Sequence, residues 1–110
     1  MEQIDYADFA KVEFQIGQII EAEKLEASEK LVKMKVDFGE AGIKTVFSGI
    51  YKWYKPEDLL NKKSVFVVNI KPLKIVGELS EAMIFAASGE DESVSLLLLD
   101  KDLPIGSKVF

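Results

Sequence analysis

The sequence has no cysteine, no histidine and no arginine among its 110 residues. Without cysteine the chain cannot form a disulfide, a thiolate metal site or a thiol nucleophile. Without histidine it lacks the commonest general base and the commonest metal ligand. We therefore expect a protein that is not an enzyme and that holds no cofactor or metal. The 14 basic residues are all lysine, a point charge that suits phosphate contacts more than base reading.

Long hydrophobic runs are also missing. Apolar runs such as Val65–Val68 and Leu96–Leu99 fall far short of a membrane span, and the acidic N-terminus lacks the hydrophobic region of a signal peptide. We expect a cytoplasmic protein, and Met1 is what a free-standing polypeptide would show. A hydrophobic fraction of 48% over 110 residues predicts a single domain, 1–110, with a modest core.

Charge is distributed unevenly along the chain, whose net charge is −5. Residues 31–77 hold nine lysines against four acidic residues, a balance of +5, whereas residues 1–30 and 78–110 each carry a balance of −5. A basic block between two acidic flanks indicates a polyanionic partner better than the net charge does. Lysines that merely decorate solvent-facing strand positions would give the same pattern, so charge alone leaves both explanations open.

The apolar residues mostly alternate in short runs, which predicts an all-β fold with little helix. A short helix is expected at about Pro56–Leu60, because proline suits the first helical position, and a loop at Pro72–Glu81. Gly17 predicts a bend or bulge in the first strand. Three strands, a helix and two strands are the order of the OB fold, a five-stranded Greek-key barrel that binds oligonucleotides. The five strands are expected at residues 13–24, 31–38, 43–50, 64–71 and 82–88.

Both ends of the chain extend the expected barrel, which covers about residues 12–88. Asp5–Lys11 is predicted to form a short helix with Asp5 as its N-cap and with Phe9 and Val12 facing inward. In the C-terminal extension, 89–110, short strands are expected at residues 94–99 and 106–110. The leucines at 96–99 do not alternate, which indicates cover on both faces. We hypothesise that a homodimer interface supplies this cover; leucines that cap the barrel of a monomer are the alternative.

Four stretches of the sequence form a pattern in chain order. They are DFAKVEFQIGQIIEAEKL at Asp8–Leu25, ASEKL at Ala27–Leu31, VFSGI at Val46–Ile50 and NIKPLKIVGELSEAM at Asn69–Met83. The chain thereby resembles the tRNA-binding domain at the C-terminus of many methionyl-tRNA synthetases. The same domain occurs as separate synthetase β subunits, as free-standing tRNA-binding proteins and in endothelial-monocyte-activating polypeptide II. Each motif alone is weak, but together they cover most of residues 8–88.

The resemblance implies an OB-fold domain that binds tRNA by its shape and backbone charge. It also implies a homodimer and, as a further partner, a methionyl-tRNA synthetase catalytic subunit. The matching positions assign Lys71 and Lys74 to phosphate contacts. They assign Asn69 and Ser80 to hydrogen bonds with tRNA, and Met83 to an apolar wall of the groove. The complete set of expected tRNA-binding residues is Lys30, Lys33, Lys35, Ser48, Asn69, Lys71, Lys74, Ser80 and Met83.

The sequence departs from the family pattern in ways that matter for RNA affinity. Leu73 stands where the family usually has arginine, and Ala82 where it has glycine. Each missing basic group weakens RNA binding and its salt dependence, so we expect a weak-to-moderate site. A CsaA-like chaperone or protein-interaction module is the alternative, although the VFSGI ending of the third strand favours the tRNA-binding branch. Glu78 and Glu81 do not indicate catalysis, because no histidine or metal cluster accompanies them.

Overall fold

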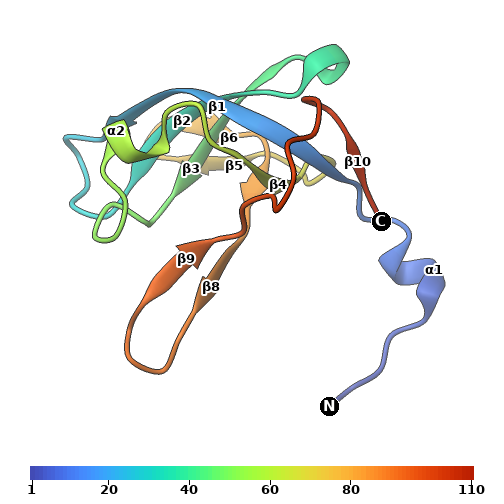
Figure 1. Cartoon of the computed structure of the whole chain (residues 1–110). Coiled ribbons are helices and arrows are strands. Elements are labelled where there is room, and N and C mark those ends of the chain that lie inside the picture. The colour runs from blue at the N-terminus through green and yellow to red at the C-terminus, as the bar shows by residue number, and fades with distance from the viewer.

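The computed structural model describes residues 1–110, and a strongly curved antiparallel sheet forms its centre (Figure 1). The strands of this sheet follow the order β3-β2-β1-β4-β7. A hydrogen bond of 2.8 Å from Glu81 N to Thr45 O joins the two ends of the sheet. The predicted all-β, OB-type five-stranded barrel is therefore confirmed, and it is nearly closed. Its strands are β1 (Phe14–Lys24), β2 (Val32–Asp37), β3 (Ile43–Ser48), β4 (Lys63–Val67) and β7 (Met83–Ile84).

Short helices lie where the sequence predicted them, before the barrel and between its third and fourth strands, and a further 3-10 helix lies between the second and third strands. They are α1 (Tyr6–Phe9), the 3-10 helix η1 (Gly39–Ala41) and α2 (Pro56–Leu59). Pro56 occupies the first turn of α2, and Asp58 Oδ2 accepts a hydrogen bond from Lys55 N at 3.1 Å. Phe9 and Val12 are 44% and 39% exposed, so the expectation that they face inward is wrong. None of these helices is long and apolar enough to cross a membrane.

Strand β1 is the longest strand, and it pairs with β2, β4 and the C-terminal strand β10 (Lys108–Val109). Its register with β2 shifts between Ile19 and Glu21, so the irregularity predicted at Gly17 lies slightly further along the strand. Gly17 serves a different purpose. A Cβ at this position would lie 2.6 Å from both the Phe38 ring and a Val36 methyl group. Glycine therefore allows these two side chains to pack directly against the backbone of β1.

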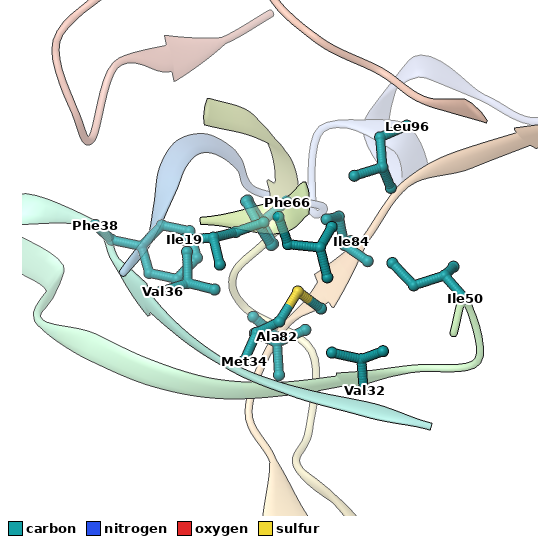
Figure 2. Packing of buried hydrophobic residues seen from close by; sticks show 12 residues of the cluster. Ile19, Val32, Met34, Val36, Phe38, Ile50, Phe66, Ala82, Ile84 and Leu96 are labelled. Carbon is teal, nitrogen blue, oxygen red and sulfur yellow. The ribbon is translucent and has the colours of Figure 1, made fainter. Parts of the chain in front are cut away.

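Alternation in β2 builds the core as predicted, because every second residue points into the barrel. Val32, Met34 and Val36 are fully buried. Figure 2 shows them with Phe66 and Ile84, which come from the other side of the barrel. At one end of this cluster Phe38 packs edge-on against Phe66, with ring centroids 5.2 Å apart. The core is therefore one continuous cluster that joins β2 to β4 and β7.

The chain differs from expectation after β4. The predicted loop at 72–81 is a second hairpin, β5 (Leu73–Ile75) paired with β6 (Glu78–Ser80). The predicted fifth strand divides into β7 and β8 (Ala86–Ser88), and β8 pairs with β9 (Val94–Leu96). Figure 1 shows this β8–β9 hairpin projecting away from the barrel. Ala86 and Ala87 offer little apolar surface to bury, which explains why the strand leaves the core here.

Candidate functional site

The β5–β6 hairpin contains most of the segment with the strongest sequence signal. Its turn consists of Val76 and Gly77, which have φ values of 47° and 82°. Two-residue hairpin turns of this kind favour asparagine or glycine, whereas a β-branched residue is strained at positive φ. Val76 is more than half exposed, as are Leu73 and Leu79 on the two strands. The hairpin therefore presents apolar side chains to solvent.

Two polar side chains attach this hairpin to β3. Ser80 Oγ accepts a hydrogen bond from Phe47 N at 3.1 Å, and Glu81 Oε1 accepts one from Thr45 N at 3.2 Å. Both contacts occupy main-chain groups on the edge of β3 that no strand ladder satisfies. We call this junction the β3 seam. Ser80 is only 7% exposed, so its hydroxyl serves the barrel, and its predicted contact with tRNA stays a prediction.

Lys33 and Lys35 project from one face of β2, as alternation predicts, and both are engaged within the protein. Lys33 Nζ lies 2.6 Å from Glu78 Oε1 and 4.0 Å from Glu23 Oε1. The hydrogen bond with Glu78 raises the pKa of Lys33 above its usual value. Lys35 Nζ donates to Thr45 Oγ1 at 2.7 Å. A phosphate that approached Lys33 would therefore compete with a carboxylate already in contact.

Lys71 and Lys74 are different, because both are exposed and neither forms an ion pair. Lys71 borders an apolar pocket of about 220 Å³ whose lining also includes Leu73, Ser80 and Met83. Because residues alternate along β5, Lys74 points from the face of the hairpin opposite to Leu73. Lys71 therefore places an unpaired charge beside an apolar pocket, which fits a phosphate backbone and an unstacked base. Lys74 offers a second unpaired charge on the other face of the hairpin.

The other predicted residues lie around this region. Asn69 follows β4, and its Oδ1 accepts a hydrogen bond from Glu13 N at 2.8 Å while its Nδ2 donates to Lys11 O at 2.6 Å. Both polar atoms of the Asn69 amide therefore hold the segment that precedes β1. Lys30 is exposed just before β2, and Ser48 is half-buried at the end of β3. The structure thus brings together Lys71, Ser80 and Met83, but not the whole predicted set.

Sequence reasoning missed the structural roles of Glu78 and Glu81, which anchor the hairpin to β2 and β3. The sequence does contain a signal for these roles. On a strand, Glu78 and Ser80 are two residues apart and share one face, but this relation is not visible when the segment is interpreted as a loop. Two aromatic residues after β3 are packing residues. Tyr51 and Tyr54 pack against the core, and no group of three acidic, histidine or cysteine side chains is arranged for a metal.

A nearly closed five-stranded barrel, with a helix between its third and fourth strands and a lysine-bearing hairpin before its last, defines an OB-type binding domain. Comparison with known families is more specific. The chain belongs to the family described as "Putative tRNA binding domain", which it matches over residues 14–108.

Known relatives agree with this assignment. The chain is 47% identical to the methionine–tRNA ligase of Methanocaldococcus jannaschii over 109 residues, which is 99% of this chain and 17% of that protein. It thus spans about a sixth of the length of such relatives. A crystal structure of a MetRS related protein from Pyrococcus horikoshii matches with a TM-score of 0.92 at 38% identity, with 100% of both chains covered. The chaperone CsaA from Bacillus anthracis matches with a TM-score of 0.89 at 32% identity, over 99% of this chain and 100% of that one.

Proposed function

We propose that this protein is a non-catalytic tRNA-binding module that docks on the RNA backbone through Lys71 and Lys74. The observation that carries the proposal is the family match over residues 14–108, which includes these two lysines on an exposed loop and hairpin. Neither lysine has to break an ion pair with a carboxylate before it can contact a phosphate. Met83, 44% exposed at the pocket, supplies an apolar wall. The module delivers tRNA to a methionyl-tRNA synthetase catalytic subunit or acts alone.

The remaining predicted residues contribute in two ways under this proposal. Lys30, Lys35 and Ser48 line the approach along β2 and β3, and Lys33 joins them if a phosphate displaces Glu78. Asn69 and Ser80 act through the protein, because their side chains fix the segments from which Lys71 and Lys74 project. Loss of either of these two polar side chains would misplace the lysines without removing charge.

The double substitution Lys71→Ala plus Lys74→Ala tests the proposal. The matched control is Lys52→Ala plus Lys108→Ala, which removes two exposed lysines that form no ion pair elsewhere on the surface. Filter binding of bulk tRNA at about 50 and 200 mM salt should show weaker binding and a flatter salt dependence for the test variant, by about 0.7–0.9 in slope for each phosphate that is no longer neutralised. Equal affinity and slope in the two double variants would contradict the proposal.

A chaperone or protein-interaction module is the second candidate. The CsaA likeness over almost the whole chain supports it, as do the exposed apolar side chains of Leu73, Val76 and Leu79 on the hairpin. The same titration separates the candidates. Negligible affinity for tRNA at low salt, together with suppressed aggregation of an unfolded client protein, would favour the chaperone.

We also propose that the protein is a homodimer whose interface includes the C-terminal extension. Leu97 is 43% exposed, and Phe9 is 44% exposed at the other end of the chain. In Figure 1 the N-terminal segment and the β8–β9 hairpin both extend below the barrel, where a second copy could cover them. Light scattering at micromolar concentration should give twice the chain mass of 12.3 kDa. A monomeric mass would rule the dimer out.

A further inference from the structure

A different pocket, bordered by lysines, lies between the start of β4 and the C-terminal tail. Its volume is about 410 Å³, and three of its lining side chains are Lys62, Lys63 and Lys101. Figure 1 shows the orange-to-red tail returning from β9 alongside β4 and β1. Residues 61–63 form one wall of this pocket, and residues 98–102 form the other.

The walls of the pocket are held together by specific contacts. Lys63 Nζ donates to Asp102 Oδ1 at 2.8 Å and to Leu103 O at 2.7 Å. Beside it, the buried hydroxyl of Ser64 donates to Leu97 O at 2.8 Å. Asn61 N donates to Ile19 O at 2.7 Å, which fixes the opposite wall to β1. The tail is therefore tied to the barrel, and the lysines around the pocket project from a fixed backbone.

The pocket carries an excess of positive charge. Its only acidic side chain, Asp102, is paired with Lys63. Lys62 is half-buried and Lys101 is exposed, and neither forms an ion pair or a side-chain hydrogen bond. The pocket thus combines two unpaired lysines with a single acidic side chain whose charge is already matched. Their ammonium groups suit a phosphate, which accepts from point charges without a fixed donor geometry.

We propose that this pocket is a second phosphate-binding site, which receives a backbone phosphate of bound tRNA on Lys62 and Lys101. The proposal rests on the tRNA-binding function proposed above, and it places Lys62 and Lys101 outside the part of the C-terminal extension that a second copy would cover. Lys63 and Lys71 are eight residues apart, so the two sites lie within about 29 Å at full extension. Each strand of a duplex presents a phosphate about every 3.4 Å along the helix axis, so about nine base pairs are long enough to reach from one site to the other.

The test variant is Lys62→Ala plus Lys101→Ala. It leaves Lys63 in place, because that side chain holds the tail, and circular dichroism should confirm an unchanged fold. Lys52→Ala plus Lys108→Ala is again the matched control. The first readout is a ¹H–¹⁵N NMR titration with inorganic phosphate, compared with chloride at equal ionic strength. Amides of residues 61–63 and 101–102 should shift in the unaltered protein and in the control, but not in the test variant.

The second readout is tRNA affinity over a range of salt concentrations. The test variant should bind about tenfold more weakly than the control, and its slope of log affinity against log salt should fall by about one. Affinity and slope equal to those of the control would overturn the proposal, and so would phosphate shifts without any effect on tRNA. If binding depends on Lys71 and Lys74 but not on Lys62 and Lys101, only the second site fails. If the unaltered chain binds no tRNA, both the site and the proposed function fail.

Discussion

Replacing Ser80 with alanine should destabilise the barrel at the β3 seam. Ser80 is 7% exposed, and its Oγ accepts a hydrogen bond from Phe47 N at 3.1 Å. Alanine keeps the Cβ and removes the acceptor, so the amide of Phe47 is left buried without a partner. Leaving such a group unsatisfied costs about 1–3 kcal/mol. For a domain of about this size, each kcal/mol lowers Tm by roughly 4–8 °C.

Urea unfolding measures this loss as a lower midpoint with an unchanged m-value, at one fixed protein concentration. Ser88→Ala is the matched control, because Ser88 is exposed and makes no side-chain hydrogen bond, so it should change stability by less than about 0.5 kcal/mol. Hydrogen exchange of the Phe47 amide should accelerate in the Ser80 variant only. Equal midpoints for the two serine variants would refute the reasoning, because the Ser80 hydroxyl would then contribute nothing to the seam.

Three further outcomes are expected. Gly17→Ala should destabilise the protein by about 1–3 kcal/mol in urea unfolding, because its Cβ would lie 2.6 Å from Phe38; wild-type stability would contradict this close approach. Val76→Asn should stabilise it by up to about 1 kcal/mol, because asparagine tolerates the φ of 47°; any loss of stability in thermal melts would count against strain there. The contact with Glu78 raises the pKa of Lys33, so it stabilises the fold at neutral pH, and this contribution is lost above pH 10.5 as the pH rises through the folded-state pKa. In thermal melts, Glu78→Gln should lack this part of the decline in Tm.

The sequence was sufficient to predict the barrel because its strands carry the required alternation. Every second residue from Val32 to Phe38 is apolar, and those residues form the core. The helix after β3 was equally predictable, because Pro56 can begin a helix but cannot lie within one. Both features depend on local physics that a short window of sequence contains.

The β5–β6 hairpin could not be predicted from its turn, because Val76 at positive φ contradicts the usual turn residues. Tertiary contacts decide its conformation, since Ser80 and Glu81 bond to β3 across more than thirty residues of sequence. The same reasoning explains the site. The sequence pattern assigned the same role, tRNA binding, to Lys33 and Lys71. Only the three-dimensional packing shows that Lys33 is already in contact with Glu78.

The β3 seam also bears on how this protein behaves in concentrated solution. An unpaired strand edge is a template on which another chain can add a strand, and such addition leads to aggregation. Along β3, the amides of Thr45 and Phe47 would form such an edge, but Glu81 and Ser80 occupy them. A molecule with the hairpin detached would expose this edge next to the buried ring of Phe47. The hairpin thus covers the edge of β3 and prevents another chain from adding a strand there. This effect does not depend on a bound ligand.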